Sequence, residues 1–284
     1  MIDALCASRL LAVVAAAAGL AACGNLVDPE LPANAERFIP SPVYARWWSM
    51  TESCSGLSGD LSAVSWFMVP GVTTVLLNGR AVEGYWSLAG NRIVLAEAGS
   101  LSGGIVRHEM LHALMKASGH SRAKFLQDCG GVVSCTEVCI SDAGPPPSPD
   151  PAAVQLGPEP LEVHVDVQPA APSRAVDDGF FAVIVSVRNP TTTPVVVVLP
   201  PHPIGGGQNT FAFDFVGQST VLSGNEVALD ASVSTFAAGE TKRHVFDFRI
   251  GSNVTSRSLP LGTYTLRAGY GGHLVGHGTV VLLP

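Results

Sequence analysis

From residue 161 onward the chain consists of short runs in which apolar and polar residues alternate. Leu161–Val167 (LEVHVDV) has this period of two throughout, and comparable strand-like runs cover 180–187, 195–199, 211–215, 244–250, 263–268 and 278–283. Glycine, proline and asparagine separate these runs, as is typical of turns between strands. About seven short strands over roughly 120 residues predict an all-β antiparallel sandwich for residues 161–284.

The earlier part of the chain mixes helical and strand-like patterns. A helix is predicted around 42–48, and strand-like runs follow at 63–69, 73–77 and 92–96. Asn78-Gly79 is a typical two-residue hairpin turn. A longer helix is predicted from Gly103 to Ser118, ended by Gly119, with a second helical piece over 122–129. Strands that precede a central helix predict an α+β domain over residues 43–140.

A proline-rich segment, 141–160, separates the two halves. Seven of its twenty residues are proline. Proline fixes φ and lacks the backbone N–H that helices and sheet ladders need, so an extended conformation is favoured. We therefore expect a semi-rigid linker between two domains, without helix or sheet ladders of its own.

The N-terminus has the pattern of an export signal. An uncharged apolar run, Leu10–Ala22, follows Arg9 directly. This run is too short to span a bilayer comfortably and is typical of a signal peptide. Residues 20–23 (LAAC) resemble the bacterial lipobox, in which the cysteine is lipidated and becomes the mature N-terminus. The resemblance implies a signal peptide over 1–22 and a lipid anchor on Cys23; ordinary secretion with cleavage nearby is the alternative.

The lipobox also bears on localisation. Gly24, and not aspartate, follows the cysteine, so the inner-membrane retention signal of such lipoproteins is missing. For a Gram-negative source, an outer-membrane anchor in the cell envelope is therefore favoured. The rest of 23–42 contains four prolines and no periodicity. We expect this segment to be a tether between the membrane and the folded part.

The amino-acid composition excludes several classes of protein. The 284 residues carry a net charge of −7 with only 14% charged residues, and the mean hydropathy is +0.33. The chain is therefore too apolar to be disordered. It also lacks the basic balance of a general nucleic-acid-binding protein, so no nucleic-acid partner is expected. The N-terminal run is the one apolar stretch that concerns a membrane, which excludes a multi-span membrane protein.

The main candidates for metal-binding and catalytic residues lie in an H-E-x-x-H motif inside the long predicted helix, His108-Glu109-Met110-Leu111-His112. The i, i+4 spacing puts both histidines on one helix face, where their imidazoles can share one Zn²⁺. Glu109 follows the first histidine directly. It is then placed to act as a general base toward a zinc-activated water without being a ligand.

A catalytic zinc site needs a third protein ligand. Gly119 can end the helix in a left-handed turn and let the chain fold back, so that His120 points toward the metal. Glu137, which lies among the cysteines further along the chain, is the second choice, and Asp128 is the third.

The stretch HEMLHALMKASGHSRAKF (108–125) resembles the SprT-like, WLM and YgjP-like zincins, and the likeness is confined to this stretch. Their pattern is HExxH, a spacer, His-Ser and an aromatic residue, here Phe125. The resemblance implies a zincin-like metallopeptidase domain over 43–140 with one zinc per chain. Carried over residue by residue, His108, His112 and His120 would bind the metal and Glu109 would be the catalytic general base.

Four cysteines remain beyond Cys6 in the signal peptide and Cys23. Cys54, Cys129, Cys135 and Cys139 form an even set in an exported domain, which indicates two disulfides with three possible pairings. We favour Cys54–Cys129 together with Cys135–Cys139; a structural zinc site is the alternative. Closing the longer loop would contribute about 4 kcal/mol in the chain-entropy model.

The second domain also resembles known modules, though loosely. The segments 187–190 (VRNP), 238–240 (AGE) and 261–264 (LGTY) are similar to bacterial immunoglobulin-like modules and to the BsuPI-type inhibitor module. The resemblance covers most of 161–284 and implies an Ig-like β-sandwich.

Together these patterns lead to one hypothesis and two alternatives. The hypothesis is a membrane-anchored zinc metalloendopeptidase that hydrolyses protein or peptide substrates in the envelope or outside the cell. The first alternative is a non-enzymatic surface lipoprotein whose β-sandwich binds a partner and whose zinc site is structural. The second, cleavage of DNA-attached proteins as in some SprT and WLM members, is opposed by the signal segment and by the net charge of −7.

Overall fold

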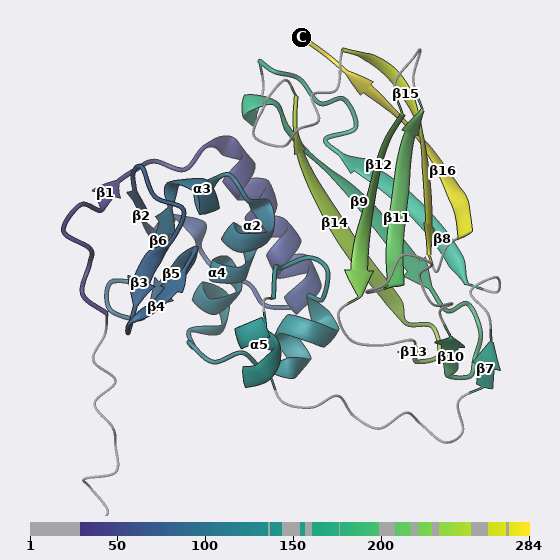
Figure 1. The fold of residues 1–284 in the computed structure, drawn as a ribbon, viewed down its shortest axis with the longest axis horizontal. Helices are drawn as coiled ribbons and strands as arrows, with labels where there is room; N and C mark the ends of the chain where they lie inside the picture. The colour runs from purple at the N-terminus through teal and green to yellow at the C-terminus, as the bar shows by residue number, and fades with distance from the viewer. Residues whose placement is uncertain are drawn as a thin grey trace, which may run out of the picture. The chain divides into compact units, whose positions relative to one another are not determined.

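The computed structural model describes residues 29–135, 137–143, 154–156, 161–175, 177–198, 208–216, 221–228, 233–250, 261–270 and 273–284 (Figure 1). Pro32–Pro284 forms one compact unit. The predicted signal peptide and Cys23 lie outside the described residues. Within the described part of the chain, every helix is too short or too polar to cross a membrane.

The N-terminal part contains a four-stranded sheet and several helices. The sheet has the order β1 (Glu36–Arg37), β2 (Ser65–Val69), β6 (Arg92–Ala96) and β5 (Gly84–Ser87), with β2 and β6 parallel and β5 antiparallel at the edge. The hairpin β3 (Val75–Leu77) and β4 (Arg80–Val82) turns at the predicted Asn-Gly pair. The helices are α2 (Pro42–Ser55), η2 (Leu61–Ala63), α3 (Glu97–Ser100), α4 (Gly103–Met115), the π-helix η3 (Ala123–Asp128) and α5 (Glu137–Asp142).

The C-terminal part is built mainly from antiparallel strands. One sheet contains β14 (Thr241–Arg249), β9 (Phe180–Arg188) and β8 (Glu162–Gln168); another contains β12 (Val221–Ala228), β11 (Gln208–Val216), β15 (Gly262–Tyr270) and β16 (His273–Leu282). A third contains β13 (Val233–Phe236), β10 (Val195–Val198) and β7 (Val154–Leu156), and the short helix η4 (Asp177–Gly179) precedes β9. The described chain is thus a mixed α/β structure with several small sheets, as expected in outline.

Buried side chains of both larger C-terminal sheets share one core. Val165 and Val183 of the first sheet and Leu266 and Val280 of the second belong to the same cluster. These positions follow the apolar half of each alternating strand, which explains why the period of two predicted strands here. The strand predictions agree with the observed elements to within a few residues at each end.

A second core fixes the long helix α4 against the N-terminal sheet. Val106 and Met110 of α4 pack with Trp47 of α2 and with Ile93 and Leu95 of β6. All of these side chains are buried. Burying them stabilises the contact of the helix with the sheet through the removal of apolar area from water, and Figure 1 shows α4 beside β5 and β6.

Several strands correct or extend the predictions from the sequence. β12 and β13 lie between the predicted runs 211–215 and 244–250. β7 lies inside the proline-rich segment and pairs with β10 in parallel, so the expectation that 141–160 forms no sheet ladder is wrong at 154–156. β1 lies inside the predicted tether and pairs with β2. The sequence patterns do not predict β5 (GYWS), because all four of its residues are buried and it shows no alternation.

The helix α4 also ends earlier than predicted, at Met115 and not at Ser118. Lys116 adopts the left-handed conformation (φ 53°, ψ 39°) that ends the helix, and Gly119 does not have a positive φ. The early end brings the backbone of Ala117 back to the last turn, where its N–H donates to the carbonyl of His112. The chain reverses direction as expected, but through a lysine.

One buried ion pair connects α4 to strand β14. Arg107, 1% exposed, donates from both terminal nitrogens to Asp247 at 2.9 and 2.8 Å, and its Nε donates to the carbonyl of Val132 at 2.6 Å. An ideal Cβ on Gly103 would lie 2.6 Å from the Asp247 carboxylate, so the glycine permits this close approach. Arg107 directly precedes the first histidine of the motif, so the pair fixes the helix next to the candidate site.

Replacing Asp247 should destabilise the fold, because it leaves a buried guanidinium without its counter-ion. For Asp247→Ala we expect a loss of about 3 kcal/mol in the free energy of unfolding, measured by urea denaturation. The matched control is Glu162→Ala, since the Glu162–Arg188 pair is 60% and 52% exposed and should contribute less than about 1 kcal/mol. Equal losses for the two variants would contradict this role of Asp247.

Candidate metal centre

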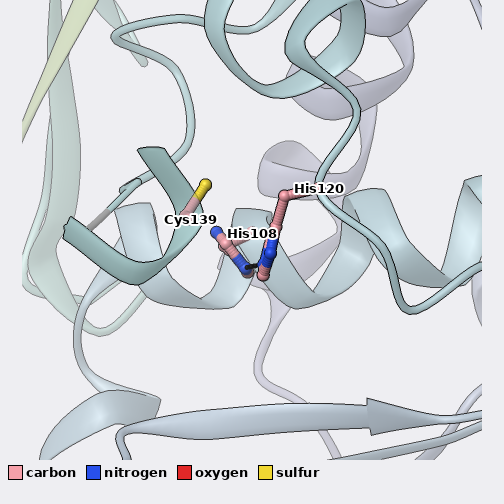
Figure 2. A group of neighbouring side chains, drawn as sticks. All are labelled: His108, His120 and Cys139. Carbon is pink, nitrogen blue, oxygen red and sulfur yellow. Dashed lines mark hydrogen bonds between the residues drawn. The ribbon is translucent and has the colours of Figure 1, made fainter. Parts of the chain in front are cut away.

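The two histidines of the H-E-x-x-H motif lie one turn apart on α4, and the third comes from the segment after it. The Nε2 atoms of His108 and His112 are 3.2 Å apart. The Nε2 of His120 lies 3.1 Å from that of His108 and 3.3 Å from that of His112. The three ring nitrogens therefore form a nearly equilateral triangle, and Figure 2 shows His108 and His120 pointing at each other.

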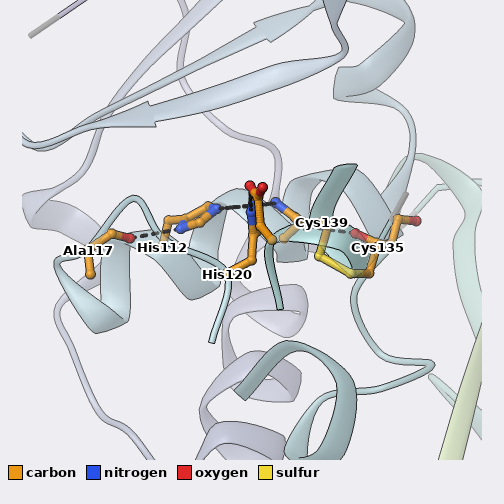
Figure 3. A network of polar contacts seen from close by, with 8 residues as sticks. His112, Ala117, His120, Cys135 and Cys139 are labelled. Atoms are coloured by element: carbon orange, nitrogen blue, oxygen red, sulfur yellow. Dashed lines mark hydrogen bonds and ion pairs between the residues drawn. A yellow bond between two sulfur atoms is a disulfide. The ribbon is translucent and has the colours of Figure 1, made fainter. Parts of the chain in front are cut away.

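The other nitrogen of each motif ring has an acceptor as its partner. His108 Nδ1 donates to the carbonyl of Ser134 at 2.6 Å, and His112 Nδ1 donates to the carbonyl of Ala117 at 2.8 Å, as Figure 3 shows for the second pair. A carbonyl oxygen only accepts, so both rings carry their proton on Nδ1 when they are neutral. Each Nε2 then presents a lone pair to the centre of the triangle.

The rings of the motif are held in the neutral form. Burial lowers the pKa of His108 to about 3, and the neighbouring His112 and His120 contribute to this lowering. Burial likewise lowers the pKa of His112 to about 4. Neutral imidazoles with converging lone pairs repel one another, and a cation at their focus removes that repulsion.

The spacing of the triangle fits a small tetrahedral cation. With Zn–N bonds of about 2.0–2.1 Å, two nitrogens of a tetrahedral site are separated by about 3.3–3.4 Å. The observed 3.1–3.3 Å is close to this value. The three ring nitrogens could therefore act together as ligands of one small cation.

An aromatic residue supports all three imidazoles. The ring of Phe125, on η3 and fully buried, lies 4.9 Å from His108, 4.8 Å from His112 and 5.0 Å from His120, measured between ring centroids. Such tilted and edge contacts restrict rotation of each imidazole. The aromatic residue of the sequence pattern thus forms the apolar wall behind the site.

His120 has a carboxylate partner that the sequence did not reveal. Its Nδ1 lies 3.1 Å from Oδ2 of Asp142, at the end of α5, and Asp142 is half exposed. A carboxylate behind a metal-binding imidazole fixes the ring and increases its basicity. Asp142 lies far along the chain from His120, inside the segment predicted as linker, and no local signal in the sequence singles it out.

Glu109 lies between the helix and the edge strand. Its carboxyl group is buried against β5, where the backbone N–H of Trp86 is its partner and its Cγ would lie 3.3 Å from an ideal Cβ on Gly84. Burial raises the pKa of Glu109 to about 8, against the opposite effect of the Trp86 hydrogen bond. A carboxyl group of raised pKa is suited to accept and return a proton near neutral pH.

Two disulfides are present, in the pairing that the sequence analysis favoured. Cys54 of α2 is bonded to Cys129, and Cys135 is bonded to Cys139 of α5. His108, His120 and Cys139 form a group whose ligand atoms all lie within 4.8 Å of one another, so this group could hold a metal ion. Because Cys139 is in a disulfide and carries no thiolate, His112 is the chemically better third ligand in this state.

Of the two alternative third ligands, the structure describes only the side chain of Asp128. Asp128 forms an ion pair with Lys124 at 2.5 Å, and Lys124 also donates to the carbonyl of Ser55. The side chain of Glu137 lies outside the described part of the chain. The geometry therefore brings together the histidines that the sequence put first.

The comparisons with known proteins do not indicate a function for this chain. No protein-family model matches the sequence, and neither does any curated protein. Among solved structures, the alkylpurine DNA glycosylase AlkC from Pseudomonas fluorescens is similar at 14% identity and a TM-score of 0.30, over 44% of this chain and 31% of that one. The chain thus spans under a third of this glycosylase.

Two further structures resemble the chain as weakly. A β-glucosidase from Listeria innocua matches at 10% identity and a TM-score of 0.26, over 44% of this chain and 16% of that one. The ApaA protein from Bordetella pertussis matches at 14% identity and a TM-score of 0.26, over 43% of this chain and 93% of that one. Similarities this low carry no argument about the site.

Asp142 offers a direct test of the contacts behind the histidines. Replacing it with alanine removes the acceptor behind His120, so we expect zinc affinity to fall about 10-fold, measured by competition with a chromogenic chelator. Asp142→Asn is the matched control, because its amide oxygen can still accept from Nδ1 and should retain most of the affinity. If Asp142→Ala binds zinc as tightly as wild type, the carboxylate does not orient His120.

Proposed function

We propose that this protein is a zinc-dependent metallopeptidase, as the H-E-x-x-H motif first suggested. One observation carries the proposal: the Nε2 atoms of three histidines lie 3.1–3.3 Å from one another, and the residue that follows the first of them in the sequence, Glu109, is buried. Three histidine ligands with an open fourth position are one ligand set of catalytic zinc sites, whereas structural sites are usually closed by four protein ligands.

The fold is compatible with a zincin-like domain followed by an Ig-like β-sandwich. The motif helix α4 packs against the sheet, and β5, antiparallel to its neighbour, lies at the edge closest to Glu109. In the C-terminal part, two antiparallel sheets share a core, as two sheets of a sandwich would. Resemblance to the SprT-like, WLM and YgjP-like zincins, carried by residues 108–125, supports the same interpretation.

In the proposed reaction, the histidines would bind the metal and Glu109 would transfer the proton. His108, His112 and His120 would hold the metal; when bound, zinc supplies a Lewis acid that polarises a carbonyl and makes water a better nucleophile. Glu109 would take a proton from the attacking water at its carboxylate and return it to the leaving amine. The hydrogen bond from Trp86 orients the carboxyl group for both transfers.

An exported, lipid-anchored protein is part of the same proposal. The support is the lipobox-like sequence ending at Cys23 and the two disulfides, which form and persist in oxidising compartments outside the cytoplasm. The substrate class would then be proteins or peptides of the envelope or the exterior. The non-enzymatic alternative, a partner-binding lipoprotein with a structural zinc, differs in predicting no hydrolysis.

The metal site is tested by metal content. We expect the purified full chain to bind about one zinc, and His108→Ala, His112→Ala and His120→Ala each to lower the bound zinc by more than about tenfold after dialysis, because a ligand is removed outright. Mass spectrometry of the metal measures this. His164→Ala on β8, an exposed histidine outside the site, is the control and should keep its zinc.

The catalytic role is tested by Glu109→Gln. The amide keeps the size and the hydrogen bond with Trp86 but cannot accept a proton, so zinc content should remain and hydrolysis of a fluorescent casein should fall by about 10²–10⁴-fold. Hydrolysis at the wild-type rate by this variant would remove Glu109 from the mechanism. A chain that binds zinc but hydrolyses nothing, wild type included, would favour the structural alternative.

A further inference from the structure

We propose that Cys139 is a fourth metal ligand held in reserve, and that reduction of the Cys135–Cys139 disulfide changes the open three-histidine site into a closed four-ligand site. The inference rests on the proposed metal site and adds a redox control to it. The position of Cys139 is its first support: its Sγ belongs to the same group, within 4.8 Å, as the ring nitrogens of His108 and His120 (Figure 2).

The distance is short enough for ligation after a small movement. In a tetrahedral zinc site, a thiolate at about 2.3 Å and an imidazole nitrogen at about 2.0–2.1 Å are separated by roughly 3.6 Å. Sγ of Cys139 lies at most 4.8 Å from a ring nitrogen of His108 and of His120, so it would have to approach each of these two nitrogens by no more than about 1.2 Å to reach that separation. To complete the set, it would also have to move toward His112. Release from the disulfide provides this freedom, because the side chain can then rotate about its Cα–Cβ bond.

The chemistry of the sulfur determines the two states. In the disulfide, Sγ of Cys139 has no charge, and zinc binds thiolates. The oxidised chain therefore has three histidine ligands and an open position, which catalysis needs. A free Cys139 would complete a Cys-His₃ set, which leaves no position for water or substrate.

The exchange step balances with a dithiol reductant, the one co-reactant it requires. A thiolate of the dithiol attacks Sγ of Cys135, which is less buried than the 2% exposed Cys139. The Sγ–Sγ bond breaks, and its electron pair leaves on Cys139 as a thiolate. The second thiol of the reductant then releases Cys135 and forms the reductant's own disulfide, so two electrons pass to the protein and the two thiol protons go to the cysteines or to solvent.

The disulfide also holds the segment that supports the histidines. Cys135 follows Ser134, whose carbonyl accepts from His108 and whose N–H donates to the carbonyl of Gly104 at 3.0 Å. Cys139 lies one helical turn before Asp142, the partner of His120. The short loop that the disulfide closes thus lies between the two supports, and opening it affects the site directly.

The two cysteines can be separated by mutation, without any reductant. Cys135→Ser leaves Cys139 as a free thiol beside the histidines, whereas Cys139→Ser breaks the same disulfide and leaves only Cys135. Both variants keep the Cys54–Cys129 bond. The full chain is loaded with Co²⁺, whose complexes with thiolates show a charge-transfer absorption that complexes with imidazoles alone do not.

We expect Cys135→Ser to bind one Co²⁺ with a thiolate-to-cobalt band, and wild type and Cys139→Ser to bind Co²⁺ without it. Zinc affinity of Cys135→Ser should exceed that of Cys139→Ser by more than about tenfold, the effect that even an outer hydrogen-bond partner of a ligand has. Should Cys135→Ser fold poorly, wild type reduced on an immobilised dithiol and then loaded with Co²⁺ should show the band, and reduced Cys139→Ser should not.

The outcomes separate this inference from the proposed function. If all three chains bind Co²⁺ and the spectra of Cys135→Ser and Cys139→Ser are the same, Cys139 is not a ligand and the inference is wrong, while the three-histidine site stands. If wild type binds no Co²⁺ at all, the proposed metal site fails and the inference fails with it.

Discussion

Three imidazole nitrogens that converge on one point are the constraint on which the site depends. The rings of His108 and His112 are neutral because they are buried, and backbone carbonyls hold their protons on Nδ1. Such an arrangement is repulsive by itself and attractive around a cation. The contacts on the far side of the rings therefore matter as much as the ligands, since they decide which nitrogen faces the centre.

The surrounding structure keeps this arrangement rigid from several directions. Arg107 connects the motif helix to β14 through Asp247 and to the segment after η3 through Val132. Phe125 packs against all three imidazoles. Helix α5 supplies Asp142, and the Cys135–Cys139 bond ties that helix to the segment that carries Ser134. Elements far apart in the sequence thus hold the three imidazole rings in place.

Under the proposed function, a metallopeptidase and a structural zinc protein would differ in one coordination position, and the role that we propose for Cys139 is to occupy it. Three histidine ligands alone would leave a fourth position open for water and substrate. The same group with a free thiol favours a closed site. Disulfide chemistry would then select between the two behaviours in one fold, which makes the redox state of the chain as important as its metal content.

The sequence by itself predicted the parts of the protein that depend on local spacing. The i, i+4 interval of His108 and His112 puts them on one face of any helix, and alternation of apolar residues determined most strands of the C-terminal part. The sequence also indicated His120 as the third ligand, because Gly119 before it could turn the chain back. In the structure, the residue with the left-handed conformation is Lys116.

Tertiary structure decided what local patterns do not encode. The edge strand β5, all of it buried, shows no alternation, and only the folded chain puts Trp86 against Glu109. Asp142 and Ser134 reach the histidines from distant positions in the chain. Such contacts depend on how α5 and the segment before it pack on α4, and packing between distant segments is set by the whole core and not by the residues in contact.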